Sequence, residues 1–378
     1  MNSTKLILVG LPMIAVTYGL SRFSYGLMLP YISESISMNS STSGLISSLS
    51  YLAYCIAIVL AMVFSKRLTP KFILMTAGFS SILGLGLIAV SPNSLILGVG
   101  IFIAGLSTGV SSPPYAEIVS ENIDKNLQNQ TNSWINSGTS IGTALTGLVA
   151  ILLADQWRVS YFIYMGIAIF VLMVNYKLLP EHRSGERQAA IRFREENWRH
   201  SLQLIIGSIL LGIVSSAYWT FSRDFILNLE SAPEYLGEWF WVIIGVAGLL
   251  GGTVGAVINK IGIGSAYRIS VVLLSASSLT LVFFSDNKMT GFLSPFLFGG
   301  SYIFMSGVLI VWGISVFKSN PSLGLGVPFV LLAFGQVIGS TLAGFIANME
   351  GYPFLFIVFS FIGLFPLFLK PKSERARG

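Results

Sequence analysis

Residues Gly138 to Gly147 read GTSIGTALTG, and residues Gly335 to Gly344 read GQVIGSTLAG. The glycines stand at the first, fifth and tenth positions of both segments, which are separated by a constant offset of 197 residues. Small and hydroxyl-bearing residues surround these glycines, a composition that favours close packing between membrane helices. The match predicts two duplicated halves. It also predicts helix packing at six glycines: Gly138, Gly142, Gly147, Gly335, Gly339 and Gly344.

The composition predicts an all-α polytopic membrane protein. Of the 378 residues, 53% are hydrophobic and 10% are charged, and the mean hydropathy is +0.77. A soluble domain carries about 25% charged residues. Because about 20 mainly apolar residues suffice to span a bilayer, the apolar runs predict twelve transmembrane helices. They cover residues 6–32, 43–64, 71–90, 94–117, 131–154, 159–179, 201–228, 236–258, 266–285, 291–317, 324–348 and 351–370.

A polar stretch in the middle of the chain separates six predicted spans from six others. We interpret residues 180–200 as a cytoplasmic linker between an N-terminal six-helix bundle, residues 1–179, and a C-terminal bundle with a cytoplasmic tail, residues 201–378. The dipeptide Ser-Arg also repeats, at Arg22 in the first span and Arg223 in the seventh. Duplication of this kind is typical of carriers that hold substrate between two repeats near the middle of the membrane.

The lysines and arginines predict the orientation. If the N-terminus is cytoplasmic, 18 of the 22 basic residues lie in cytoplasmic loops and tails. Arg158 and Lys288 then lie outside, and Arg22 and Arg223 lie within spans. The positive-inside rule therefore predicts a multi-pass protein of the plasma (inner) membrane with both termini in the cytoplasm.

Twelve spans, a six-plus-six repeat and a long middle loop together resemble the major facilitator superfamily. The glycine-rich fifth span is similar to the antiporter-type signature of that superfamily, although the usual proline is missing. Residues 64–71, FSKRLTPK, are a degenerate form of its signature loop, and residues 19–30, GLSRFSYGLMLP, resemble the YbfB-like branch. The resemblance implies a transporter with two pseudo-symmetric six-helix bundles. Organophosphate antiporters of this superfamily hold an anion between arginines on spans one and seven, where Arg22 and Arg223 stand here.

Arg22 is the leading candidate for a ligand group. No other charged residue occurs between Lys5 and Glu34. A guanidinium inside the hydrocarbon costs several kcal/mol unless it finds partners or water. At 100° per residue, Arg22 shares a helix face with Tyr18 and Tyr25, whose hydroxyls can orient a bound anion. The alternative is an arginine satisfied by helix carbonyls or by a buried acid.

Four further residues, Arg223, Trp219, Asn136 and Gln336, complete the predicted substrate site, and Asp224 is a separate candidate for proton coupling. Arg223 shares a helix face with Trp219 and supplies a second positive charge, unless it extends to the headgroups. Asp224 is a candidate for proton coupling, a partner for an arginine, or part of the outer rim. Asn136 and Gln336 lie on repeat-equivalent spans and either face the cavity or form interhelical hydrogen bonds.

These features predict a secondary active transporter that moves a small organic anion by alternating access. The alternative is proton-driven efflux of a drug-like or amphipathic metabolite, and a channel, a sensor or a membrane enzyme is disfavoured. The single cysteine, Cys55, excludes an intrachain disulfide, and both histidines lie in the polar middle stretch. We expect no catalytic residue, metal or cofactor, and no nucleic acid partner. A small-molecule substrate and the lipid bilayer are the expected partners of a monomer.

Overall fold

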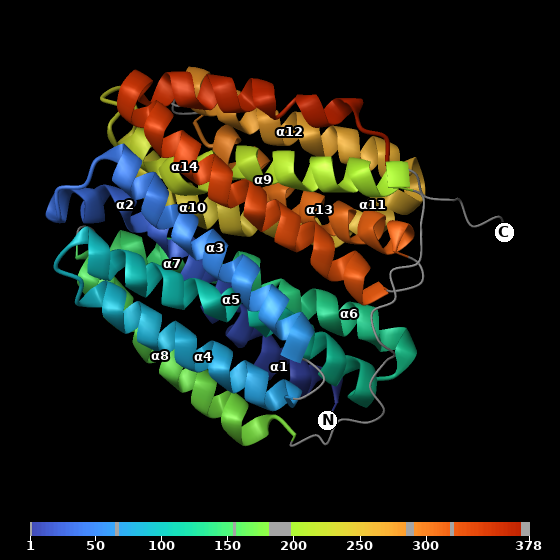
Figure 1. Cartoon of the computed structure of the whole chain (residues 1–378). Coiled ribbons are helices and arrows are strands. Elements are labelled where there is room, and N and C mark those ends of the chain that lie inside the picture. Colours follow the sequence, from blue (N-terminus) through green and yellow to red (C-terminus); the bar gives the residue numbers. More distant parts are fainter. Residues whose placement is uncertain are drawn as a thin grey trace.

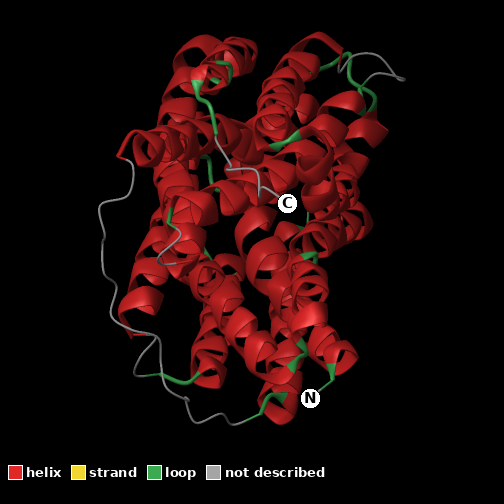
Figure 2. Cartoon of the chain, turned by 90° about the vertical axis from the view of Figure 1, so that its right-hand side faces the viewer, coloured by secondary structure: helices red, strands yellow, loops and turns green. Residues whose placement is uncertain are grey.

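The computed structural model describes residues 2–64, 68–153, 156–180, 198–284, 291–317 and 321–371. Over these residues the chain is almost entirely helical and contains no strand (Figures 1 and 2). Most of the predicted linker lies outside the described residues. The N-terminal half contains α1 (Ser3–Ile14), η1 (Ala15–Phe23), α2 (Ser24–Ser35), α3 (Ser40–Phe64), α4 (Pro70–Ala89), α5 (Ser94–Asn122), α6 (Lys125–Asn136), α7 (Gly138–Leu153) and α8 (Trp157–Leu178).

The C-terminal half contains α9 (Trp198–Leu227), α10 (Glu234–Gly248), η2 (Leu249–Thr253), α11 (Val254–Ile261), α12 (Ile263–Phe284), α13 (Leu293–Val316), α14 (Pro321–Ile362) and η3 (Phe365–Phe368). Within the described residues, eleven helices are long and apolar enough to cross a membrane. The last of them, Gly326–Phe368, joins two predicted spans across Gly351, whose φ of 82° breaks the helix. The predicted membrane-spanning helical fold is thus confirmed, and this merged pair explains the difference between eleven and twelve.

The first span is not a uniform α-helix. Residues Ala15–Phe23 form a π-helical segment between α1 and α2. Its backbone is held from the side, because the hydroxyl of Thr108 donates to the carbonyl of Thr17 at 2.8 Å. Since π-helical hydrogen bonds join residue i to i+5, the segment changes which residues share a face. Arg22 stands near the end of this segment.

The repeated glycines pack against helices at matching places in the two halves. A side-chain carbon at Gly138 would lie 2.3 Å from the carbonyl oxygen of Leu11, on the first span. At Gly335 it would lie 2.1 Å from the carbonyl oxygen of Ile209, on the seventh span. Any side chain would therefore separate the helices. A side-chain carbon at each of the other four glycines would also lie within 2.8 Å of a neighbouring helix. The nearest residues are Ala15 for Gly142, Val242 for Gly147, Ile213 for Gly339 and Ser40 for Gly344.

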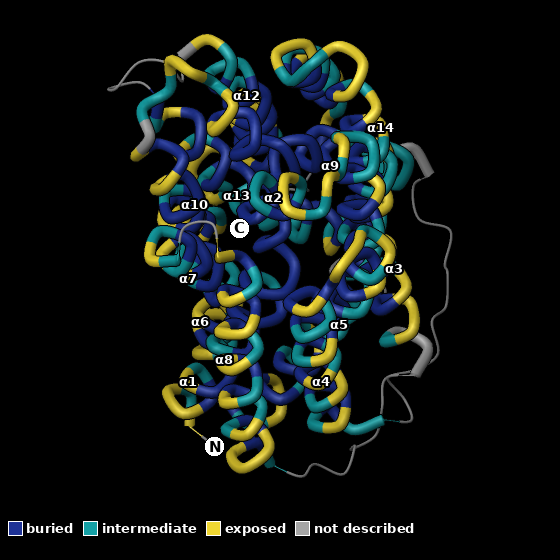
Figure 3. The backbone as a smooth tube through the Cα atoms, turned by 90° about the vertical axis from the view of Figure 1, so that its left-hand side faces the viewer, coloured by how far each residue is buried: buried dark blue, intermediate teal, exposed yellow. Residues whose placement is uncertain are grey.

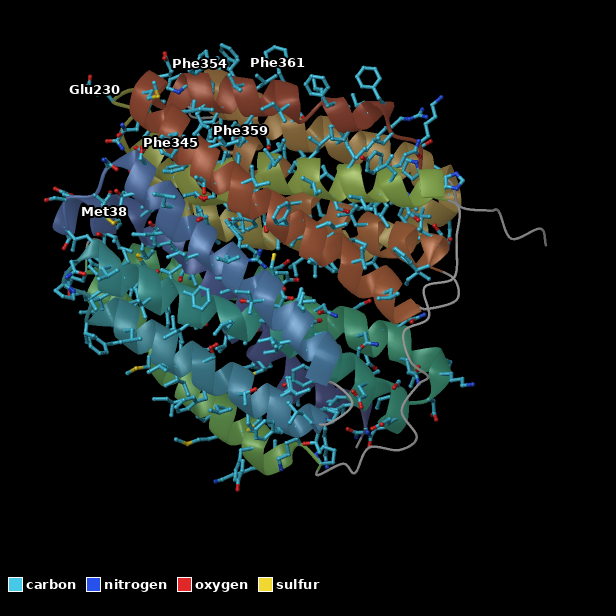
Figure 4. The ribbon with its side chains drawn as sticks, in the orientation of Figure 1. Met38, Glu230, Phe345, Phe354, Phe359 and Phe361 are labelled. Atoms are coloured by element: carbon cyan, nitrogen blue, oxygen red, sulfur yellow. The ribbon has the colours of Figure 1, made fainter. Side chains whose placement is uncertain are left out.

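The two halves meet mainly where α3 packs on α14, α7 on α10, and α2 on α9. Figure 1 shows the first half below and the second half above, with the start of α1 and the segment η3 toward the right. We call this end of the bundle the terminal side. The opposite end, which carries Met38 and Glu230 in Figure 4, is called the Glu230 side.

The periphery is apolar and the interior is densely filled, as expected for a protein surrounded by lipid. Figure 3 shows buried residues concentrated toward the middle of the bundle and exposed ones at its rim. The last helix illustrates the pattern, because Phe361 is 60% exposed whereas Phe359 is 1% exposed. Large exposed apolar side chains are tolerated where the surrounding solvent is hydrocarbon.

Candidate functional site

Arg22 lies at the interface of the two halves. Its side chain is only 6% exposed, and its Nη2 donates to Oε1 of Gln336 on α14 at 2.7 Å. The guanidinium carbon lies 4.3 Å from the ring centroid of Tyr54 and 5.0 Å from that of Tyr51, both on α3. The Nε atom of Arg22 is buried and has no hydrogen-bond partner, and among the described residues Arg22 forms no ion pair. The cation is therefore only partly satisfied.

The second half supplies the opposite wall of the site. Gln336 donates from Nε2 to the hydroxyl of Tyr302 at 3.2 Å and to that of Ser215 at 3.4 Å. Trp219 stacks on Phe23 with ring centroids 4.0 Å apart, and its buried indole Nε1 has no partner among the described residues. Arg22 and Trp219 thus each bring an unpartnered donor to a region bordered by aromatic rings.

The structure places Tyr18 with this group but not Tyr25. The Tyr18 ring lies 6.4 Å from that of Tyr54, edge to face, and its phenol interacts electrostatically with Arg22. The Tyr25 hydroxyl instead donates to the carbonyl of Ser43 at 3.1 Å. The physical reason is the π-helical segment, because a helical wheel at 100° per residue does not apply through it.

Asn136 does not meet Gln336 either. Its side chain is exposed at the end of α6, accepts from the hydroxyl of Ser112 at 2.8 Å and donates to the carbonyl of Asn132 at 2.9 Å. The repeat explains the difference. Asn136 stands two residues before Gly138, whereas Gln336 directly follows Gly335, so the two side chains do not occupy equivalent positions.

Arg223 has partners of its own on the Glu230 side of Arg22. It is buried and donates from Nε to the carbonyl of Gly237 at 2.9 Å, from Nη1 to the carbonyl of Leu27, and from Nη2 to the hydroxyl of Tyr31 at 3.3 Å. It shares no described hydrogen-bond partner with Arg22. Arg223 joins the seventh span to the first and the eighth, which differs from the paired anion site that the sequence predicts.

Asp224 takes part in a second connection between the halves. It is 8% exposed and accepts from the hydroxyl of Tyr352 and from Nδ2 of Asn228 at 3.1 Å. The Tyr352 hydroxyl also lies 3.3 Å from that of Ser40, on the N-terminal half. Together with Arg223, these contacts close the bundle on the Glu230 side.

Several residues of this site escape the sequence interpretation. Tyr51 and Tyr54 stand three residues apart in the second predicted span, so a search for phenols at helical spacing would have found them. Tyr302 is one aromatic residue among many and gives no such signal. Among the described residues, no group of histidine, cysteine and acidic side chains is placed to hold a metal ion.

Comparison of the sequence with known protein families identifies the family of this chain. The sequence profile described as the Major Facilitator Superfamily matches residues 13–327. The sialic acid transporter NanX of Escherichia coli (strain K12) is 25% identical over 300 residues, which cover 74% of this chain and 72% of NanX.

Solved structures share the fold. The nucleoside transporter NupG superposes with a TM-score of 0.78 at 14% identity, covering 97% of this chain and 97% of NupG. A D-xylose-proton symporter gives a TM-score of 0.75 at 14% identity, covering 97% of this chain and 98% of the symporter. At such identities the likeness concerns the fold alone.

Proposed function

Since this chain belongs to the major facilitator superfamily, we propose that it is a secondary transporter that carries a small organic anion, with one carboxylate held by Arg22. The observation that carries the proposal is a buried arginine with a neutral amide as its hydrogen-bond partner and a free Nε donor. Leaving a buried donor unsatisfied costs about 1–3 kcal/mol. A carboxylate removes this cost and neutralises the charge.

The charge of the site suggests an anion with a single negative charge. Arg223 donates through Nε, Nη1 and Nη2 to groups of the protein and shares no described partner with Arg22, so we assign the substrate contact to Arg22 alone. A dianion such as a phosphate ester would bring one charge more than the site balances. Tyr18, Trp219 and Gln336 complete the site, with Phe23 and Tyr302 as aromatic walls.

The name of one relative agrees with this chemistry. NanX is a sialic acid transporter, and sialic acid is a sugar that carries one carboxylate. The rings of Trp219 and Phe23 offer apolar area for the sugar ring, and Arg22 offers two parallel donors for the carboxylate. Sialic acid is therefore the first substrate to test.

Asp224 is the proposed proton-coupling group. It is an acid within a membrane span, and it accepts from Tyr352, whose hydroxyl lies 3.3 Å from that of Ser40 on the N-terminal half. Protonation of Asp224 weakens its hydrogen bond from Tyr352 and thereby alters the contact that Tyr352 makes with Ser40. We further propose a monomer in the plasma (inner) membrane with both termini cytoplasmic, so that the terminal side faces the cytoplasm. The stretch GLSRFSYGLMLP supports placement in the YbfB-like branch.

The decisive experiment is transport into liposomes that contain the purified protein. Uptake of labelled sialic acid and of small monocarboxylates is compared with uptake of a lipophilic cation, with and without a pH gradient. We expect anion uptake that is lost in Arg22→Ala and retained in Arg158→Ala, an arginine on the Glu230 surface. Transport of the cation without any anion would refute the proposal and favour efflux of amphipathic compounds.

A further inference from the structure

The guanidinium edge of Arg22 that faces Gln336 is only half used. Its Nε and Nη2 hydrogens project in parallel from that edge, which is the arrangement that a carboxylate accepts with both oxygens. Nη2 donates to the single oxygen of the Gln336 amide, whereas Nε, although buried, has no described partner. The Gln336 oxygen thus accepts from Nη2 alone. A carboxylate would accept from both Nε and Nη2.

The orientation of the Gln336 amide follows from chemistry. Because arginine only donates, the amide oxygen must face Arg22 and the amide nitrogen must face away. That nitrogen donates to Tyr302 and Ser215, both in the C-terminal half. Gln336 is therefore anchored in one half and presents a single acceptor to the other.

We propose that Gln336 takes the place of the substrate carboxylate when no substrate is bound, and that the arriving carboxylate displaces it from Arg22. This inference rests on the proposed function. When the carboxylate displaces Gln336, Arg22 loses one hydrogen bond to a neutral amide. It gains an ionic contact that uses both Nε and Nη2. It also breaks the hydrogen bond that joins α14 to the first span across the two halves. Gln336 thereby sets the affinity for the anion and links its binding to movement of the halves.

The proposal makes opposite predictions for two substitutions. Gln336→Ala removes the competing oxygen, so the anion binds about tenfold more tightly, the order of one hydrogen bond to a charged group. Gln336→Glu provides a permanent carboxylate that fills both donors, so anion binding is lost. If Gln336 is instead an ordinary ligand of the substrate, Gln336→Ala weakens binding.

The experiment measures binding to the purified protein through tryptophan fluorescence, since Trp219 stacks on Phe23 beside the site. The probes are sialic acid and acetate, with acetamide as a neutral control at matched ionic strength. Gln336→Leu serves beside Gln336→Ala, because it retains the side-chain volume without an acceptor. Gln156→Ala, on the Glu230 surface, is the control for an unrelated glutamine. Thermal unfolding shows that each variant is folded.

The outcomes separate the two proposals. If Arg22→Ala binds as well as the unchanged protein, or if neither probe binds the unchanged protein, the anion function itself is wrong. If Arg22→Ala abolishes binding and Gln336→Ala or Gln336→Leu weakens it, only the displacement is wrong. Tighter binding in these two variants, together with loss of binding in Gln336→Glu, supports displacement.

Discussion

Gly142 lies directly against the backbone of Ala15: a side-chain carbon at Gly142 would be 2.4 Å from the Ala15 carbonyl oxygen. Gly339 and Ile213 repeat the same relationship at 2.4 Å in the second half. These contacts bring the fifth span onto the first and the eleventh onto the seventh. They hold the π-helical segment, and hence Arg22, in position, because Ala15 is its first residue.

A valine at Gly142 should therefore destabilise the protein. Overpacking of this kind typically costs about 1–3 kcal/mol, and a contact with backbone leaves little room to relax. We expect Gly142→Val to lower the midpoint of thermal unfolding in detergent and to reduce anion uptake. Gly166→Val is the control, since nothing lies within 4 Å of a side-chain carbon at Gly166. Equal unfolding midpoints for the two variants would contradict the argument.

The sequence predicts the helices well and the site only in part. The length of the apolar runs and the glycine repeat are local patterns. The spans, the family and the close helix contacts at the glycines could therefore be predicted from them. The environment of Arg22 depends on a π-helical segment that no local pattern announces. For that reason the 100° wheel placed Tyr25 beside Arg22, whereas the structure places Tyr54 there. The long-range pairing of Arg22 with Gln336 requires the relative position of the two halves.

Loss of Arg223 should open the Glu230 side. This residue donates to Leu27, Tyr31 and Gly237, and each hydrogen bond from a charged donor contributes about 1.5–3 kcal/mol. To detect opening, Ser47, which bonds Thr220 across the halves at 2.8 Å, is replaced by cysteine in a Cys55→Ser background. We expect Arg223→Ala to speed labelling of this cysteine by a membrane-impermeant maleimide at least tenfold.

Arg158→Ala is the matched control for this measurement, because Arg158 lies on the same side but bonds Ser35 and Ser91 within the N-terminal half. Its labelling rate should equal that of the background protein. An unchanged rate in Arg223→Ala would show that this arginine does not hold the closed state. If Arg223→Ala instead changed the preference for monoanions over dianions, Arg223 would have to be a substrate ligand.

Asp224→Asn should separate transport from proton coupling. Asparagine can still accept from Tyr352 but carries no exchangeable charge. We expect the variant to exchange anion for anion across the liposome membrane at a nearly normal rate, while acceleration by a pH gradient disappears. Tyr352→Phe keeps the acid but removes the hydroxyl through which Asp224 acts on Ser40, so it should reduce the gradient effect. A full gradient effect in Asp224→Asn would exclude this acid as the coupling group.

Tyr54 should stabilise the Arg22 cation through its ring. The guanidinium carbon lies 4.3 Å from the ring centroid, and such contacts contribute about 0.5–2 kcal/mol. Tyr54→Phe keeps the ring and should bind the anion almost unchanged. Tyr54→Leu removes the ring and should destabilise the folded protein by that amount in thermal unfolding. The same loss in both variants would assign the effect to the hydroxyl.

Arg22→Lys is the sharpest test of the anchor, because it keeps the charge and removes the two parallel donors. Lysine offers a point charge on a flexible stem and cannot contact both carboxylate oxygens in a fixed plane. Lysine also has no planar group to stack on the ring of Tyr54. We expect anion uptake at limiting concentration to fall at least tenfold, a difference of about 1.4 kcal/mol, while Arg22→Ala falls further. Arg22→Lys uptake equal to that of the unchanged protein would show that charge alone is required, and that the half-used edge facing Gln336 has no part in binding.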